Sequence, residues 1–209
     1  MIIGNHIKRE TRQLADKTFP LGRLIYFVTN NVHKFNEARL VLAEYNIAVA
    51  MLRAKTPEIQ DDNIEHIAKI GAVEASRRTR LPVIVEDAGL FIDALNGFPG
   101  PYSSYVYRTL GKEGILRLLE GCENRRARFK SAIAFHGPGM KTKCFLGVVE
   151  GKISKTVRGE SGFGFDPIFE PDEFPGRTFG ELSIKEKNRV SHRSRALRSF
   201  AEWYLKMKN

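Results

Sequence analysis

The sequence has only two cysteines among its 209 residues, and it has no long apolar run. Its longest uninterrupted apolar stretch, residues 47–52, has six residues, whereas a membrane-spanning helix needs about 20. Residues 1–12 include several charged side chains where an export signal would carry an apolar segment. Cys122 and Cys144 have neither metal-site nor redox-motif spacing. These absences predict a protein with no membrane span, located in the reducing cytoplasm.

Charge, by contrast, is plentiful and unevenly placed. The 34 Lys and Arg residues outnumber the 24 Asp and Glu residues, which gives a formal charge of +10. Residues 1–23 carry five basic and two acidic side chains, and residues 183–209 carry eight and two. Such basic termini suit a nucleic-acid backbone, the phosphates of a small ligand, or simply a solvated surface.

Apolar periodicity predicts an α/β protein. Residues 24–28 form a continuous apolar run, which is typical of a strand buried on both faces of a parallel sheet. An amphipathic helix follows, and a second one is predicted over residues 64–78. It leads to another buried strand, residues 81–85, which we expect to end at the acidic pair Glu86 and Asp87.

The second half of the chain is predicted to be antiparallel. Residues 129–135 alternate between the two faces of a strand, and a hairpin is expected around Gly151. A turn-rich connection is expected at residues 167–176, and a capping box at residues 183–186 begins a helical C-terminal part. The apolar stripe of the last helix consists of Ala196, Phe200, Trp203 or Tyr204, and Met207.

Four segments could carry chemistry, and the first lies where the strand at residues 24–28 gives way to a helix. Its residues are Thr29, Asn30, Asn31, Val32, His33 and Lys34. Free N–H groups at a helix start favour an anion, and the lysine adds a mobile positive charge. The segment lacks the glycines of a Walker or dinucleotide-binding loop. Taken alone, it fits equally an Asn31 helix cap beside a solvated lysine.

The second segment is the acidic pair Glu86 and Asp87. Adjacent carboxylates repel each other, so they lie in water, beside cations or around a divalent metal, and hard oxygen ligands suit Mg²⁺. Glu58 lies in a predicted turn and could supply another oxygen ligand. One carboxylate would then polarise a water molecule for attack on phosphorus.

The third segment combines glycines with aromatic residues. Its residues are Phe163, Gly164, Phe165 and Asp166, after Gly162. Glycines let the backbone approach a ligand closely, and aromatic rings offer flat faces to a heterocycle. The alternative is a tight turn with core phenylalanines.

The fourth segment, residues 187–193, gathers basic side chains around a break between two helices. Lys187 and Arg193 could clamp an anion, helped by N–H groups at the start of the next helix. His192 is otherwise an incidental cap residue.

Together and in this order, the segments resemble the inosine/xanthosine triphosphate pyrophosphatase family, also called the Ham1 family. The similarity covers residues 24–209. The matching residues are Thr29, Asn31, Lys34 and Glu37, then residues 86–90, 93–95, 97–102, 163–167, 186–188 and 191–193. Each segment alone is ambiguous, but four in one order and spacing are highly specific.

The resemblance implies an elongated α/β fold with a central mixed β-sheet, flanking helices and two lobes with a substrate cleft between them, usually in a homodimer. It implies Mg²⁺-dependent hydrolysis of ITP, dITP and XTP to the monophosphate and pyrophosphate, which removes deaminated purines from the nucleotide pool. Asp87 would be the proton acceptor and a metal ligand, Glu58 the other metal ligand, and Glu86 a supporting one.

The same resemblance divides the remaining residues between the two ends of a nucleotide. Residues 29–34 and Lys187 would hold the phosphates. Residues 163–166, His192 and Arg193 would frame the base and recognise its 6-keto oxygen. GTP also has a 6-keto oxygen, so discrimination against GTP would have to depend on the 2-amino group of guanine.

Three departures distinguish this chain from the family pattern. Ala88 replaces a usual Ser or Thr, Gly71 replaces a phosphate-contacting lysine, and Ser104 stands where relatives carry a basic residue. A weakened nucleotide-binding relative, a pyrophosphatase of broader or Maf-like base specificity, and a nucleic-acid-binding protein are therefore kept as alternatives. We expect residues 1–23 to be an extension and residues 24–209 to be one domain that binds a small molecule, with no membrane or stable nucleic-acid partner.

Overall fold

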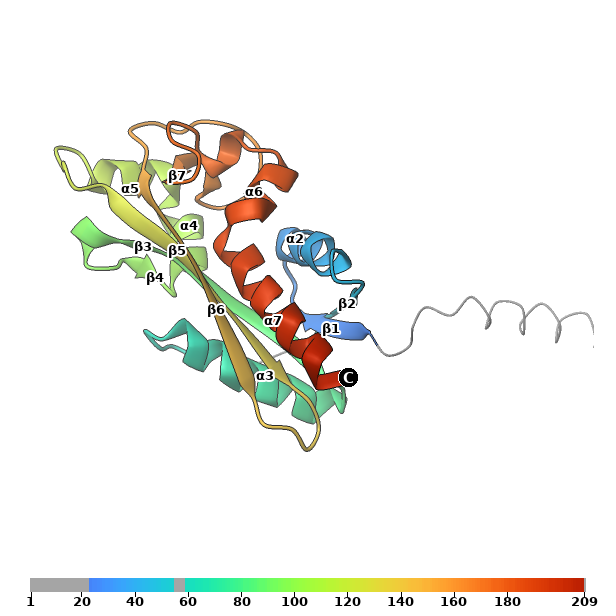
Figure 1. Ribbon diagram of the computed structural model, residues 1–209. Coiled ribbons are helices and arrows are strands. Elements are labelled where there is room, and N and C mark those ends of the chain that lie inside the picture. Colours follow the sequence, from blue (N-terminus) through green and yellow to red (C-terminus); the bar gives the residue numbers. More distant parts are fainter. Residues whose placement is uncertain (1–22, 55–58, 209) are drawn as a thin grey trace, which may run out of the picture.

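The computed structural model describes residues 23–54 and 59–208 of the chain (Figure 1). All but the last residue of the predicted extension, and the candidate metal ligand Glu58, therefore lie outside the described residues. The described strands are β1 (Leu24–Val28), β2 (Ala48–Leu52), β3 (Val83–Ile92), β4 (Pro99–Gly100), β5 (Arg126–His136), β6 (Lys143–Ile153) and β7 (Phe169–Pro171). The described α-helices are α2 (Val32–Ala43), α3 (Ile64–Thr79), α4 (Ser103–Thr109), α5 (Gly111–Leu118), α6 (Ile184–Val190) and α7 (His192–Lys208). Short 3-10 helices are η1 (Asp93–Leu95), η2 (Asp166–Ile168) and η3 (Phe179–Glu181).

Within the described residues, seven strands form one mixed sheet. The order is β2-β1-β3-β5-β6-β7, and β4 pairs with β3. β1 runs parallel to β2 and β3, whereas the other pairs are antiparallel. The predicted α/β fold with a central mixed sheet is therefore confirmed.

Helices α2 and α7 cover one face of the sheet, and α3 covers the other (Figure 1). Phe27 of β1 packs in the first core together with Ala196, Phe200 and Tyr204 of α7, which belong to the predicted apolar stripe. Met207, the last residue of that stripe, is 37% exposed. Strands β1 and β3 are thus packed on both faces, as their continuous apolar runs predicted, whereas the edge strand β2 is only partly buried.

A second core occupies the other end of the long β5–β6 hairpin. Ile115 of α5, Phe169 of β7 and Phe179 of η3 are fully buried there. Figure 1 shows α4, α5, β7 and α6 gathered around this end, with α2, α3 and β2 around the opposite end. The two cores give the molecule the two lobes that the resemblance implied.

Side-chain caps fix where three helices begin. The Asn31 side chain accepts a hydrogen bond from the N–H of Lys34 at 3.1 Å, and Asn63 accepts one from Glu65 at 2.9 Å. Ser183 and the glutamate three residues later form the predicted capping box. Local sequence therefore determines the starts of α2, α3 and α6.

Strand β3 is longer than the sequence predicted. It runs through the acidic pair to Ile92, because β5 pairs along its whole length, while its parallel pairing with β1 does stop at Val85. Successive side chains of a strand point to opposite faces. Glu86 therefore shares the α7 face with Ile84, whereas Asp87 shares the α3 face with Val85.

The predicted hairpin around Gly151 is wrong. β6 continues through Gly151 to Ile153, and the hairpin joins β5 to β6 instead. Glycine is required because β7 approaches closely: a Cβ at this position would lie 2.2 Å from the carbonyl oxygen of Glu170. The connection predicted at residues 167–176 accordingly contains strand β7.

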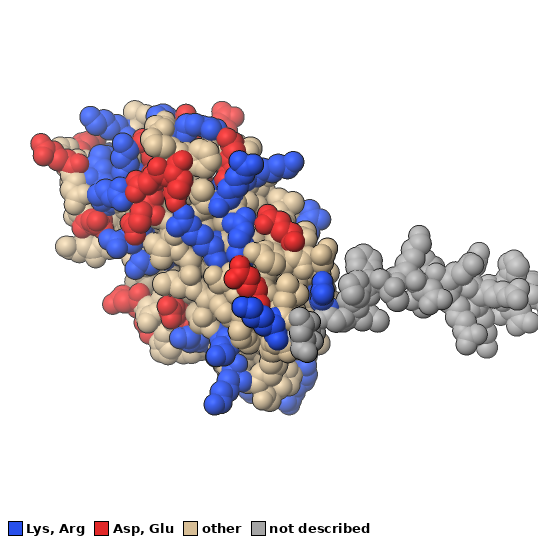
Figure 2. Space-filling model, in the orientation of Figure 1, with Lys and Arg blue, Asp and Glu red and all other residues tan. Residues whose placement is uncertain are grey.

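Charges of both signs are interspersed over the face shown in Figure 2. Several are paired, such as Arg126 with Asp172 at 2.8 Å. No helix in the described ranges is long and apolar enough to cross a membrane. Cys122 and Cys144 are both free thiols.

Candidate active site

A cavity of about 730 Å³ is lined by segments from both lobes. They are the β1–α2 loop with the first turn of α2, the middle of β3, helix α4, strand β5, the loop before η2 and the start of α7. The cavity brings together eleven of the residues predicted to bind substrate. These are Thr29, Asn30, Asn31, His33, Lys34, Phe163, Gly164, Phe165, Asp166, His192 and Arg193.

The β1–α2 loop has a defined shape and leaves its lysine at the cavity. The Thr29 hydroxyl accepts a hydrogen bond from the N–H of Asn31 at 3.1 Å, and Asn31 caps α2. The ammonium group of Lys34 lies 3.6 Å from Glu86. Val32 is exposed and does not line the cavity. The predicted Asn31 cap is therefore present, and Lys34 beside it lines the cavity.

A buried charge network lies behind the cavity. The Lys187 ammonium group donates to Glu37 at 2.7 Å and to Asp166 at 2.6 Å, and each of these side chains is at most 5% exposed. Burial disfavours the charged form of Lys187, but these carboxylates outweigh burial and raise its pKa. Lys187, predicted to hold phosphates, is therefore a cation enclosed by acids and does not line the cavity.

Arg193 joins this network to Glu86. Its guanidinium group donates to both oxygens of Glu86 and also to Glu37. Ser131 donates a further hydrogen bond to Glu86 at 2.7 Å. Although burial opposes ionisation of Glu86, Arg193 and Lys34 lower its pKa to about 2. Glu86 is thus an ionised counter-charge whose oxygens are already engaged.

Asp87 is in a different environment, on the other face of β3, and it does not line the cavity, which β3 reaches through Ala88 and Gly89. Burial raises the pKa of Asp87 to about 6, against the opposing effect of Lys34. Its Oδ2 atom is buried and has no hydrogen-bond partner among the described residues. A buried carboxylate oxygen without a partner fits a hard cation such as Mg²⁺. The described residues contain no cluster of three His, Cys, Asp or Glu side chains, and Glu58 lies outside them.

Aromatic rings form the other wall of the cavity. The N–H of Phe163 donates to Asp166 at 2.8 Å, which anchors the glycine-flanked loop. The His192 ring stacks on Phe129, with centroids 4.7 Å apart. Burial and the charge of Arg193 hold the pKa of His192 well below its ordinary value of 6.5. The ring is therefore neutral at pH 7.

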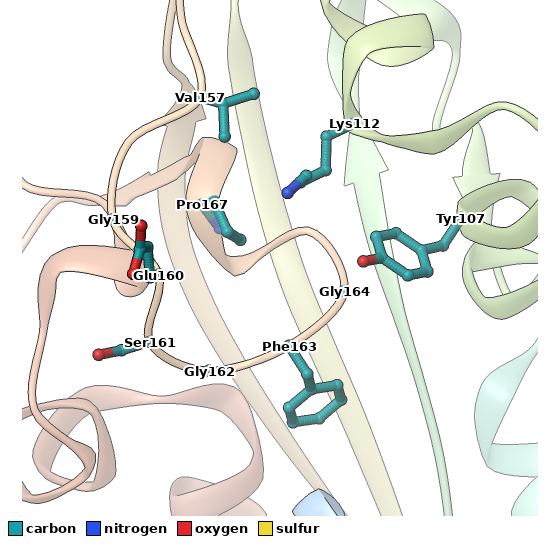
Figure 3. Close-up of a pocket in the computed structure, with 10 residues that line it drawn as sticks. All are labelled: Tyr107, Lys112, Val157, Gly159, Glu160, Ser161, Gly162, Phe163, Gly164 and Pro167. Carbon is teal, nitrogen blue, oxygen red and sulfur yellow. The ribbon is translucent and has the colours of Figure 1, made fainter.

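A neighbouring cavity of about 520 Å³ lies on the other side of the loop formed by residues 162–164, which lines both cavities. Figure 3 shows the Phe163 ring turned away from the space into which the Lys112 side chain extends. The Tyr107 hydroxyl points toward Gly164 in the same view. The loop is therefore a partition whose aromatic side chain faces the larger cavity.

Several residues of the site were missed by the sequence analysis. Glu37 was matched as part of a motif without a role, and Ser131, Phe129 and Tyr107 were not singled out. Because side chains alternate along residues 129–135, Phe129 and Ser131 lie on one face of β5, and this pattern in the sequence could have pointed to both residues. The partners of Glu37 are 150 residues away in the sequence, so no local pattern points to them.

Comparison with known proteins places this arrangement in a family. A model of the Ham1 family matches residues 25–203 of the chain. The chain belongs to the Ham1 family. Solved Ham1 structures agree: the Ham1 protein of Staphylococcus aureus is 30% identical, with a TM-score of 0.76, and the match covers 89% of this chain and 100% of that one.

Curated members of the Ham1 family are similar along nearly their whole length. The dITP/XTP pyrophosphatase of Methanopyrus kandleri is 51% identical over 86% of this chain and 95% of its own. That of Thermococcus kodakarensis is 50% identical over 85% and 95%. Of the three departures from the Ham1 pattern, Ala88 and Ser104 line the cavity, whereas Gly71 packs against Val85 between α3 and β3.

Proposed function

We propose that this protein hydrolyses dITP, ITP and XTP to the corresponding monophosphate and pyrophosphate, and so clears deaminated purines from the nucleotide pool. The observation that carries the proposal is the composition of one cavity in a Ham1-family chain. The helix start with Lys34 and the aromatic rings of Phe163 and His192 line this one cavity. These are the chemistries that a triphosphate and a heterocyclic base require. Relatives about 50% identical bear the name dITP/XTP pyrophosphatase.

The mechanism assigns the proton transfer to Asp87. Its carboxylate would accept the proton of the water molecule that attacks the α-phosphorus. Lys34 would stabilise charge on the phosphate oxygens, aided by the N–H groups at the start of α2. Glu86 keeps Lys34 and Arg193 in place through its ion pairs.

Asp87 is also the residue that we propose as a Mg²⁺ ligand, together with Glu58. When bound, Mg²⁺ would supply charge neutralisation for the triphosphate. Glu86, which was predicted as a supporting ligand, has its oxygens engaged by Arg193 and Ser131. Glu86 would therefore act on a cation at Asp87 through its negative charge and not as a direct ligand.

Base selection is assigned to hydrogen-bond donors near the aromatic rings of the cavity. A donor that faces the 6-keto oxygen of hypoxanthine or xanthine would face the 6-amino group of adenine and lose its hydrogen bond. Arg193 lines the cavity and carries only donors. Adenine nucleotides should therefore be poor substrates, while discrimination against guanine depends on its 2-amino group.

Substrate profiling tests the proposal. The purified protein with Mg²⁺ is incubated with ITP, dITP, XTP, GTP, ATP, dTTP and UTP, and pyrophosphate release is measured. We expect kcat/KM for ITP and XTP to exceed that for ATP by about 100-fold or more. Comparable rates for dTTP or UTP would indicate the broader, Maf-like specificity. Tight calorimetric binding of a nonhydrolysable ITP analogue without turnover of ITP would indicate a binding protein instead.

Further expectations accompany this function. We infer a cytoplasmic location, supported by two free cysteines, and a homodimer, supported by the resemblance to the Ham1 family. We also propose that residues 24–209 are a single catalytic domain, since both lobes share one sheet and line one cavity. Light scattering on the purified protein tests the dimer. No stable nucleic-acid partner is expected, and the basic residues are interspersed with acids on the face in Figure 2. Steeply salt-dependent binding of DNA or RNA at physiological ionic strength would favour the nucleic-acid-binding alternative.

A further inference from the structure

The side chains of His33 and Phe163 are stacked inside the larger cavity. Their ring centroids are 5.1 Å apart and their planes make an angle of 19°. His33 comes from the first turn of α2 and Phe163 from the loop after β6, so the stack joins two segments 130 residues apart in sequence. Within the described part of the chain, the imidazole of His33 makes no hydrogen bond or ion pair. The stack is therefore what holds this exposed side chain in place.

Phe163, in contrast, is fixed from behind. Its N–H is bonded to Asp166, and Asp166 is bonded to the buried Lys187. The charged groups of Lys187 and Arg193 lie 4.9 and 5.4 Å from the centroid of the Phe163 ring. A Cβ on Gly162 would lie 2.2 Å from the Asp166 carboxylate, so the chain packs closely on its anchor. Of the two rings in the stack, His33 is the one that is free to move.

The spacing of the rings leaves no room for a base between them. Carbon atoms in contact are about 3.5–4.0 Å apart, so a flat base held between two rings needs them roughly 7 Å apart. The observed separation is 5.1 Å. The imidazole thus occupies the space above Phe163 that a stacked purine would fill.

We infer that His33 is a base-stacking residue that covers Phe163 in the free protein. When a purine nucleotide binds, the base takes the place of the imidazole on Phe163, and His33 moves onto the outer face of the base. This inference rests on the proposed function and changes one part of it: His33, which was grouped with the phosphate-binding residues 29–34, acts on the base. Because a purine offers a larger face than a phenyl ring, the exchange favours the bound state.

The movement can be followed by NMR. The chain has five histidines, and the imidazole resonance that disappears in His33→Phe identifies His33. Two probes are compared on the full-length protein: inosine 5′-(α,β-methylene)triphosphate, and inorganic triphosphate, which has no base. We expect the His33 resonance to shift with the inosine analogue and to stay in place with inorganic triphosphate. Equal shifts with both probes, or a shift with neither, would overturn the inference.

Reciprocal variants separate stacking from charge. His33→Phe keeps a ring and has no ring nitrogen, whereas His33→Lys introduces a cation and removes the ring. Calorimetry should show that His33→Phe binds the inosine analogue about as tightly as wild type, while His33→Lys and His33→Ala bind it about three- to tenfold more weakly. If His33→Lys binds the inosine analogue as tightly as wild type and His33→Phe binds it more weakly, His33 acts on the phosphates. If all three variants bind the analogue equally tightly, His33 has no stacking role.

The design also separates this inference from the proposed function. His136→Ala, at the end of β5 next to the β5–β6 turn, serves as the matched control and should bind both probes normally. If wild type does not release pyrophosphate from ITP but the His33 resonance responds to the inosine analogue, the proposed function fails and the stacking role stands. If ITP is hydrolysed and His33 responds to neither probe, the stacking role fails alone.

Discussion

The Nε–H group of Arg193 donates one hydrogen bond shared between the two carboxylate oxygens of Glu86, at 2.8 and 2.9 Å, and the two side chains are at most 3% exposed. The pair joins the start of α7 to the middle of β3, 107 residues earlier in the chain. It holds in position the two elements that carry the residues assigned to the base and to the attacking water. The ion pair is therefore part of the framework of the site.

Breaking this pair should destabilise the protein strongly. In Arg193→Met, the buried carboxylate of Glu86 loses its main partner, which typically costs about 3–5 kcal/mol in the free energy of unfolding. Urea denaturation followed by circular dichroism measures it. Arg126→Met breaks the exposed pair with Asp172 and should cost about 1 kcal/mol or less. The double variant Glu86→Gln/Arg193→Met should be more stable than Arg193→Met alone; a double variant that is less stable would contradict this account.

Replacing Asp87 should remove activity and spare the fold. In Asp87→Asn the side chain keeps its shape but can neither accept a proton nor bind a cation strongly, so kcat should fall by about 10²- to 10⁴-fold. Pyrophosphate release from ITP measures the rate, and the urea midpoint reports folding. Asp172→Asn, which alters an exposed carboxylate in the other lobe, is the control and should keep its rate. A loss of less than tenfold in Asp87→Asn would exclude it as the base.

Local sequence patterns were sufficient to predict those helices and strands whose formation depends on residues within the element itself. The apolar run of β1, the Asn31 cap of α2 and the box from Ser183 to Glu186 each contain the information for one element. The four chemical segments were located for the same reason. The expectation that they form one site came from the family resemblance, since each segment alone also fitted an ordinary structural role; the structure brings residues of the first, third and fourth segments to one cavity, with Glu86 and Asp87 beside it on β3.

Features that depend on a distant partner were not predictable in this way. β3 passes through Glu86 and Asp87 because β5 supplies hydrogen bonds along it, and the sequence near Val85 carries no sign of β5. Gly151 was predicted to lie in a turn because the sequence around it does not show that β7 packs closely against it. Lys187 was predicted to hold phosphates, and nothing in the sequence around it shows that Glu37 and Asp166 enclose it in the described structure.

His192 should make stability depend on pH below neutrality. In the unfolded chain a histidine takes up a proton as the pH falls through about 6.5, whereas burial and the charge of Arg193 keep His192 neutral in the folded protein. Between these two pKa values the unfolded state binds more protons, so the free energy of unfolding decreases as the pH falls. The contribution of His192 to the free energy of unfolding is fully present above pH 6.5. Below pH 6.5 it decreases by up to about 1.4 kcal/mol for each pH unit.

Urea denaturation of wild type and His192→Gln between pH 7.5 and 5 tests this effect. Glutamine cannot take up the proton, so the stability of the variant should fall less steeply over this range than that of wild type. The slope of the free energy of unfolding against pH should differ between the two proteins by nearly the amount that corresponds to the uptake of one proton on unfolding. If both proteins lose stability in parallel, His192 is protonated in the folded state.

Gly147 should be required for the position of α7. This residue of β6 lies beneath the start of α7, and a Cβ there would be 2.0 Å from the carbonyl oxygen of His192 and 2.6 Å from the amide nitrogen of Ala196. Because both atoms belong to the helix backbone, no side-chain rotation relieves the clash, and α7 has to shift. Gly147→Ala should cost about 1–3 kcal/mol in the free energy of unfolding.

The same shift should impair catalysis, since it moves His192 and Arg193 away from the cavity. A displacement of about 1 Å can reduce kcat/KM by about 100-fold. Gly137→Ala is the control: its Cβ would be 3.0 Å from the Met140 sulfur, a flexible side-chain atom that can move aside. Gly147→Ala should therefore lose both stability and ITP hydrolysis while Gly137→Ala keeps both, and a fully active Gly147→Ala would show that the site tolerates displacement of α7.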